Sequence, residues 1–171
     1  MKALLALALF GAAPAMATGP SPAPVEQWAA KDACTDLLLT YAQGLDQRDP
    51  LKIWPLFTQD GVWTADGKVT MNGQVALRTL WEGLAAQPRP TVGRHAASNI
   101  RFTVEDANHA RGSALIVQYR YDPAALDGIS DFGPMMLVDV TMDCVRQPEG
   151  WRFQRMELKS VSATGYVHGK G

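Results

Sequence analysis

The stretch LLLTYAQGLDQRDPLKIWPLFTQDGVW, residues 37–63, decides the fold, because it joins the end of one helix, a charged elbow and the start of a strand. Apolar residues recur every three or four positions over residues 25–45, which predicts an amphipathic helix. Asp49 followed by Pro50 predicts a second, short helix, since aspartate caps free N–H groups and proline suits the first helical turn. The elbow between the two helices is charged and includes Asp46.

Beyond the elbow the apolar pattern changes from a helical period to a period of two. Asp60-Gly61 predicts a turn into a strand around residues 62–64. Asp66-Gly67 is typical of a tight hairpin turn, and a third helix is predicted over residues 73–86. Alternating apolar and polar residues then predict four long strands, over residues 94–104, 111–121, 135–145 and 151–160. Helices followed by antiparallel strands indicate an α+β fold, in which three N-terminal helices cover one face of a curved sheet and enclose a pocket.

The first 17 residues have the pattern of an export signal. Lys2 precedes an apolar run, and Ala15-Met16-Ala17 has the small-x-small form that signal peptidase cuts. The apolar run is too short to span a membrane, so we expect no membrane anchor. We expect a signal peptide over 1–17, a flexible linker over 18–24, one domain over 25–160 and a C-terminal tail over 161–171. The predicted location, after cleavage near Ala17, is periplasmic or secreted.

Charge and motifs exclude several classes of function. The formal net charge is −1, and no basic run is interleaved with aromatic residues, so we expect no nucleic-acid partner. The three histidines, His95, His109 and His168, lie far apart in the chain and lack the spacing of a metal site. Neither a phosphate-binding loop nor a dinucleotide glycine motif occurs. We therefore expect no metal and no other cofactor.

The two cysteines, Cys34 and Cys144, lie on the apolar faces of their predicted helix and strand. In an oxidising compartment a disulfide between them would close a long loop and stabilise the fold by about 4–5 kcal/mol on the chain-entropy model. The alternative is a pair of buried thiols that behave as small hydrophobic side chains. The residues alone leave both alternatives open.

Three polar side chains are candidates for chemistry. His95 begins a long strand, on the same parity as Asn99, and a histidine in a pocket can act as general acid or base. The alternative for His95 is a hydrogen-bonded residue at a strand end with no chemical role. Tyr41 lies on the core face of the first helix and Asp46 follows it by five residues. Five residues turn a helix by about 140°, so the two converge only if the helix ends or distorts near Gly44.

The segments YAQGLDQRDPLKIWPLFTQDGVWTADG and RHAASNIRFTVEDANHARGSA, with a glycine-led helix between them, resemble the SnoaL-like branch of the nuclear transport factor 2-like superfamily. The resemblance covers about residues 25–160 and implies a cone-shaped, cystatin-like roll with an internal pocket. Around the polar residues the chain is most similar to bile acid 7α-dehydratase and scytalone dehydratase. By that resemblance Tyr41, Asp46 and His95 fall on catalytic positions. A second histidine of scytalone dehydratase has no counterpart, because the Met135-Met136 pair occupies that region.

The resemblance implies a cofactor-free dehydratase or isomerase that acts on a hydrophobic, ring-containing hydroxy compound. In this hypothesis His95 removes a proton, Asp46 orients the imidazole, and Tyr41 donates a hydrogen bond to the developing oxyanion or the leaving hydroxyl. A ketosteroid isomerase is disfavoured, because its aspartate position falls on Ala65, and Asp66 next to it points to the opposite face. The competing hypothesis is a non-catalytic periplasmic binder of an apolar small molecule, and the residues do not decide between enzyme and binder.

Two further expectations concern surfaces. The pocket wall is expected to include the residues Trp54, Phe57, Trp63 and Asn99. The long strands carry apolar residues on both parities, for example Val117 against Ile116, whereas a strand with one buried face alternates cleanly. We therefore expect the outer face of the sheet to be covered by another subunit, in a homodimer or homotrimer.

Overall fold

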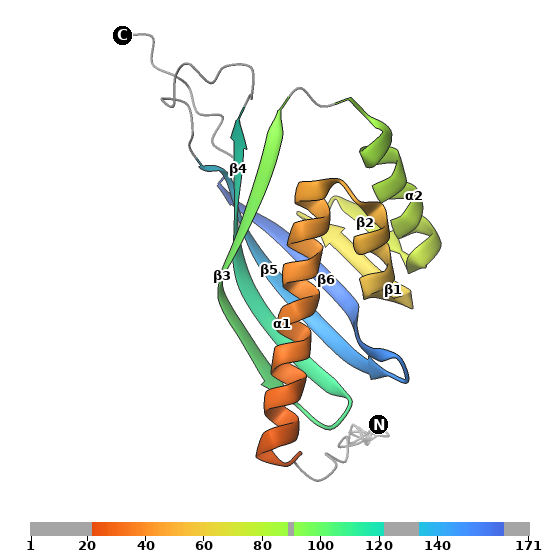
Figure 1. Ribbon diagram of the computed structural model, residues 1–171, viewed down its shortest axis with the longest axis vertical. Helices are drawn as coiled ribbons and strands as arrows, with labels where there is room; N and C mark the ends of the chain where they lie inside the picture. The colour runs from red at the N-terminus through yellow and green to blue at the C-terminus, as the bar shows by residue number, and fades with distance from the viewer. Residues whose placement is uncertain (1–21, 89–90, 122–133, 163–171) are drawn as a thin grey trace, which may run out of the picture.

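The computed structural model describes residues 22–88, 91–121 and 134–162 (Figure 1). Its elements follow in the order α1 (Pro24–Gln47), the 3₁₀ turns η1 (Pro50–Lys52) and η2 (Trp54–Leu56), β1 (Phe57–Ala65), β2 (Val69–Asn72), α2 (Gly73–Ala86), β3 (Val92–Val104), β4 (His109–Tyr121), β5 (Pro134–Gln147) and β6 (Gly150–Ser162). The α+β class and the four long strands are confirmed. The predicted signal peptide lies outside the described residues.

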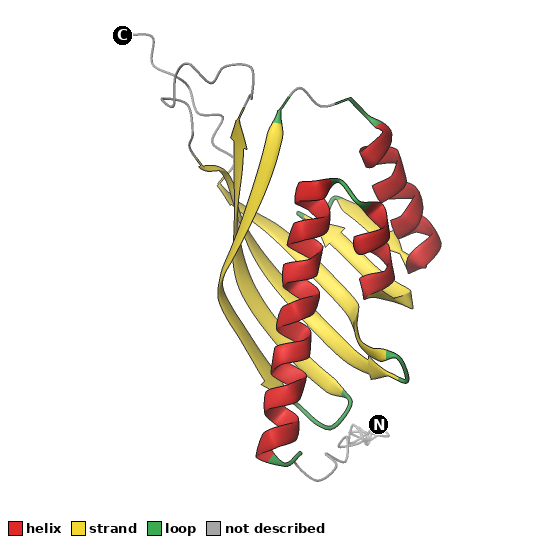
Figure 2. Cartoon of the chain, viewed as in Figure 1, coloured by secondary structure: helices red, strands yellow, loops and turns green. Residues whose placement is uncertain are grey.

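The six strands form one curled sheet in the order β2-β1-β6-β5-β4-β3. Neighbouring strands are antiparallel except β1 and β6, which run parallel. Both α-helices lie on the same side of the sheet, and α1 runs along its concave face (Figures 1 and 2). The sheet therefore wraps around α1, the helix that carries two of the three candidate residues. Within the described ranges, no helix is long and apolar enough to cross a membrane.

The core fills the space between α1 and the concave face. On β4 and β5 the even-numbered residues point inward, which buries the side chains of Ala110, Ala114, Ile116, Val138, Val140, Met142 and Cys144. At the base of β1 the rings of Phe57 and Phe153 pack with their centroids 5.4 Å apart. Because these residues fill the interior, the sheet holds α1 in a fixed position, where it packs mainly against β3 and β6.

The short second helix that starts at Asp49-Pro50 is present as two 3₁₀ turns, η1 and η2, and Pro55, which lacks an N–H group, lies in the second. Two local predictions were wrong, and the reasons are physical. The turn expected at Asp60-Gly61 lies inside β1, where the pairing with β6 is irregular. In β3, Asn99 adopts φ 53° at a bulge, and its side chain is exposed. The bulge switches the inward parity from odd to even residues, so Asn99 does not line the interior.

Candidate functional site

Asp46 and His95 are joined by two hydrogen bonds between α1 and β3, both to the same carboxylate oxygen. The Asp46 carboxylate oxygen Oδ1 accepts from the backbone N–H of His95 at 2.9 Å and lies 2.8 Å from Nδ1 of the imidazole. A carboxylate only accepts hydrogen bonds, so Nδ1 carries the proton and Nε2 of the neutral ring is left as a proton acceptor. The side chain of His95 is 11% exposed and that of Asp46 is 20% exposed. The two residues, called the sheltered pair below, are therefore largely protected from solvent but still accessible to a small molecule.

The end of α1 holds Asp46 in this position. Arg48 terminates the helix in the left-handed conformation, with φ 55°, and the N–H of Asp49 donates to the carbonyl of Gly44 at 2.9 Å. The guanidinium of Arg48 donates to the carbonyls of Leu84 and Ala85, at 2.6 and 3.0 Å, near the end of α2. The elbow is thereby attached to both helices. Asp49 caps η1 by accepting from the N–H of Leu51 at 3.0 Å, as its sequence position predicts.

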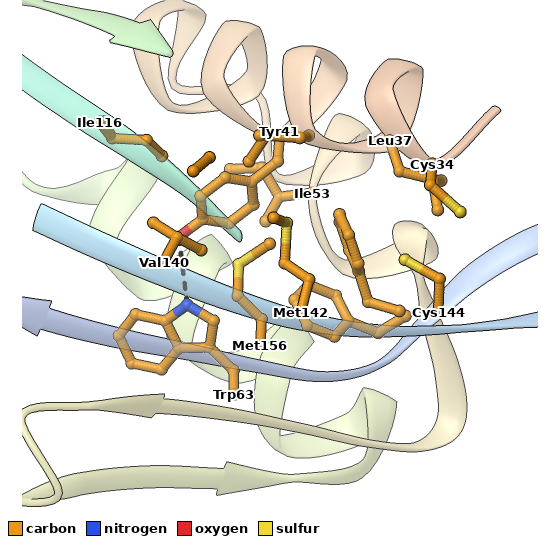
Figure 3. Close-up of a cluster of buried hydrophobic side chains, with 14 of the residues drawn as sticks. Cys34, Leu37, Tyr41, Ile53, Trp63, Ile116, Val140, Met142, Cys144 and Met156 are labelled. Carbon is orange, nitrogen blue, oxygen red and sulfur yellow. Dashed lines mark hydrogen bonds between the residues drawn. The ribbon is translucent and has the colours of Figure 1, made fainter. Parts of the chain in front are cut away.

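Tyr41 is fully buried, and its hydroxyl points toward the indole of Trp63 (Figure 3). Its hydroxyl accepts a hydrogen bond from the indole N–H of Trp63 at 3.1 Å. Its ring packs edge-on against that of Trp81, with the ring centroids 6.0 Å apart. Burial raises the pKa of the Tyr41 hydroxyl well above its usual range, so the hydroxyl is neutral at physiological pH. Since α1 continues without distortion to Gln47, Tyr41 and Asp46 project from different sides of the helix.

Gln118 is a polar residue of the interior that sequence reasoning missed. It lies on β4 directly opposite His95 in the β3–β4 pairing, and it is 7% exposed. Its carboxamide has no hydrogen-bond partner among the residues that the structure describes. The signal in the sequence was a polar residue on the parity of Ala114 and Ile116, a parity that carries small or apolar residues from Ala110 to Ile116 and Arg120 near the strand end.

The aromatic residues expected to wall a pocket are part of the packed core. Phe57 is completely buried, Trp63 is buried, and Trp54 is half-buried beneath the guanidinium of Arg78, 5.9 Å from its ring centroid. Their contribution to a ligand-binding wall stays a prediction. Cys34 and Cys144 are both buried free thiols on facing elements, α1 and β5, and their side chains point toward each other (Figure 3).

A second carboxylate–histidine pair offers a comparison. His109 Nδ1 lies 2.9 Å from the Asp106 carboxylate, but both side chains are well exposed in a turn. A groove of about 360 Å³ lies at the same end of the molecule, where it is lined among others by Glu26 and Trp151. Glu26 is 20 positions from Asp46 on the same helix, a separation of about 30 Å at 1.5 Å per residue. The groove is therefore separate from the sheltered pair, and we place the candidate site at Asp46 and His95.

The fold and the sheltered pair together define a class of protein: a nuclear transport factor 2-like, cystatin-like roll with a histidine and a carboxylate joined between its long helix and its sheet. The chain belongs to the SnoaL-like domain family, whose model matches residues 26–157. This finding confirms the family that the sequence segments suggested. No curated protein matches the chain in sequence.

Solved structures share the fold at low sequence identity. A protein from Novosphingobium aromaticivorans, provisionally named a scytalone dehydratase, is 19% identical with a TM-score of 0.69, over 83% of this chain and 91% of that one. A further protein from that organism, described as an NTF2-like protein with a cystatin-like fold, is 20% identical with a TM-score of 0.67, over 82% and 88% of the two chains. The hexachlorocyclohexane dehydrochlorinase LinA-type3 from Novosphingobium barchaimii is 18% identical with a TM-score of 0.67, over 83% and 93%.

Proposed function

We propose that the protein is a cofactor-free dehydratase or isomerase, which moves a proton on a hydrophobic, ring-containing hydroxy compound with His95 as the general base. The observation that carries the proposal is the Asp46–His95 contact, in which one carboxylate oxygen bonds both the backbone N–H and the ring Nδ1. This contact fixes the tautomer and the orientation of the imidazole, which are the two properties a general base needs. The names of the structural neighbours, a dehydratase and a dehydrochlorinase, are compatible with elimination chemistry.

The proposed dehydration proceeds in two steps. Nε2 of His95 takes the proton from the carbon next to a carbonyl group, and the electron pair of the broken C–H bond forms an enolate. The imidazolium, stabilised by the Asp46 carboxylate, then returns the proton to the hydroxyl on the next carbon, which leaves as water. The organic product is a conjugated ketone. An isomerase would return the proton to another carbon, and no group would leave.

Tyr41 is proposed to donate a hydrogen bond to a substrate oxygen. Its hydroxyl accepts from Trp63, so its own proton remains available for donation. Burial holds the group neutral, which keeps that proton in place at the pH where a histidine base operates. In this role Tyr41 would contact the leaving hydroxyl or the developing oxyanion.

Deuterium exchange tests the proton-transfer step without a known leaving group. The protein, incubated in D₂O with a cyclic aryl ketone such as α-tetralone, is expected to replace the hydrogens next to the carbonyl, as followed by NMR. His95→Asn keeps a donor toward Asp46 but lacks Nε2, so its exchange rate should fall by roughly 10²–10⁴. His109→Ala, at the exposed pair, is the matched control and should retain the parent rate.

The outcome also separates an enzyme from a binder. If the parent protein and His95→Asn exchange no faster than buffer across a panel of cyclic ketones, the proton-transfer proposal is refuted. An apolar molecule released intact from such an inactive preparation would then support the non-catalytic binder. Equal, rapid exchange by both proteins would show that His95 is not the base.

The protein is further proposed to be exported and to assemble as a homodimer or homotrimer through the outer face of the sheet. On that face Ala96, Val117 and Leu137 are direct neighbours across β3, β4 and β5, and they form an apolar row. An apolar row on a face that the helices do not cover favours a second covered surface. Recovery of protein that begins near Thr18 from the periplasm or medium would test the proposed export.

A further inference from the structure

Gln118 lies beside the proposed base. In the antiparallel pairing of β3 with β4 it is the direct partner of His95, and directly opposite residues have their Cβ atoms about 4.5–5.5 Å apart on the same face. Asp46 reaches His95 from α1, so that shared face is the concave one. A Cβ placed on Gly93, two residues before His95, would lie 4.0 Å from Nε2 of Gln118. The carboxamide therefore lies against β3, next to the imidazole.

The carboxamide of Gln118 makes no hydrogen bond to a described residue, yet its polar atoms are not fully enclosed: the enclosed, unpaired side-chain atoms of the described ranges belong to Trp54, Thr64 and Trp81. Water or a ligand can therefore supply the partner that a largely buried amide requires. Another glutamine finds its partner within the protein. The Gln74 side chain, for example, donates to the carbonyl of Phe57 at 2.8 Å. Gln118 combines low exposure, a carboxamide with no hydrogen bond to a described residue, and a position directly opposite His95 on the neighbouring strand. A ligand oxygen would complete its hydrogen bonding.

We propose that Gln118 binds the carbonyl oxygen of the substrate and stabilises the oxyanion that forms when His95 removes the neighbouring proton. This assignment rests on the proposed function. In a ketone the acidic C–H and the carbonyl oxygen are two bonds apart, so base and oxyanion donor must be close neighbours. Gln118 meets that condition by its register with His95. A neutral amide also favours a ketone over a carboxylate, because it brings no balancing positive charge.

A hydroxy ketone has two oxygens, and we assign a different hydrogen-bond donor to each: Gln118 to the carbonyl oxygen and Tyr41 to the hydroxyl. As the C–H bond breaks, its electron pair moves into the enolate and negative charge develops on the carbonyl oxygen, where the Nε2–H of Gln118 donates. Tyr41 then remains for the hydroxyl that leaves as water. Removal of a single donor to an oxyanion typically slows catalysis by roughly 10²–10³.

A stability comparison tests the assignment without any substrate. Gln118→Leu removes a polar group that has no protein partner, so its Tm should equal or exceed that of the parent. Gln74→Leu is the matched control, because it leaves the buried Phe57 carbonyl unpaired, and its Tm should fall by roughly 2–8 °C. An equal fall for both variants would show that Gln118 has a structural role and would overturn the proposal.

Exchange of α-tetralone hydrogens in D₂O provides the functional readout. Gln118→Leu should lose about 10²–10³ of the exchange rate, while Gln74→Leu, assayed below its Tm, should exchange like the parent. Exchange that is lost in His95→Asn but kept in Gln118→Leu would overturn the role of Gln118 and leave the proposed function standing. No exchange by the parent protein would overturn both together.

Discussion

Oxidation of Cys34 and Cys144 is expected to join α1 to β5 when the protein is made in an oxidising compartment. The two thiols are buried and free, and they point toward each other from facing elements. Each thiol would lose a proton and an electron to a protein dithiol–disulfide oxidant, and the new bond would close a loop of about 110 residues. On the chain-entropy model a loop of that length stabilises by about 4–5 kcal/mol. For a domain of this size that corresponds to an increase in Tm of roughly 10–20 °C.

The timing of the reaction follows from the burial of the pair. The hydrogen bond from Cys34, together with desolvation, raises the pKa of the Cys144 thiol far above its usual range. The thiolate is the species that attacks a disulfide, so the folded, reduced protein should react with oxidised glutathione only as fast as it opens. The bond is therefore expected to form before α1 packs onto the sheet.

Intact mass after alkylation in denaturant measures the bond directly. Protein produced with residues 1–17, the proposed export signal, and isolated from an oxidising compartment without reductant should carry no alkyl label, and dithiothreitol should lower its Tm by about 10–20 °C. Cys34→Ser and Cys144→Ser should each take up one label and should not respond to the reductant. Two labels on the exported parent protein, with the same Tm in the presence and absence of dithiothreitol, would refute the disulfide.

Three further outcomes follow from packing and charge. Gly112→Ala would place a Cβ 2.2 Å from the ring of Phe102 and should lower the free energy of unfolding by about 1–3 kcal/mol. Gly83→Ala, on α2, would place a Cβ with no atom within 4 Å and should raise the free energy of unfolding by about 0.5–1 kcal/mol. Urea unfolding of the two variants and the parent measures both changes. The pKa of Tyr41 is raised in the folded protein, so its contribution to stability is complete below about pH 10, where an unfolded tyrosine titrates, and is lost as the pH rises further. The fall in the free energy of unfolding above about pH 10 should therefore be smaller in Tyr41→Phe than in the parent, as urea unfolding at alkaline pH would measure. Leu137→Glu on the outer face should yield monomers by light scattering at micromolar concentration, and a monomeric parent would contradict the proposed assembly.

The order of elements was predictable because most of it depends on local pattern. The period of two in the second half of the chain predicted the four long strands, and Asp66-Gly67 predicted the hairpin, where both residues adopt positive φ angles of 52° and 63°. The turn predicted at Gly61 failed for a reason that only packing reveals. A Cβ at that position would lie 2.9 Å from Cβ of Phe57, so glycine is required inside β1 by close approach.

The candidate site was predictable in its residue types but only partly in its contacts. Asp46 and His95 are 49 positions apart, and their contact depends on how far the sheet curls around α1. Tyr41 keeps the core position that its helical spacing predicted, yet its hydrogen bond goes to Trp63 on a distant strand. The partner of Gln118 depends on the register of β3 against β4, which the bulge at Asn99 shifts. Register of this kind is a tertiary property.

The position of β6 sets the order in which the molecule can be built. The last strand, Gly150–Ser162, is inserted between β5 and the first strand, β1, and it supplies the parallel pairing that joins the two parts of the sheet. Until these residues emerge during synthesis, β1 and β2 have no connection through the sheet to β3, β4 and β5. Contacts between the two ends of a chain form slowly, because the intervening loop must be closed first. The sheet of a nascent chain therefore stays incomplete until residues 150–162 have been made, and that interval leaves time for thiol chemistry.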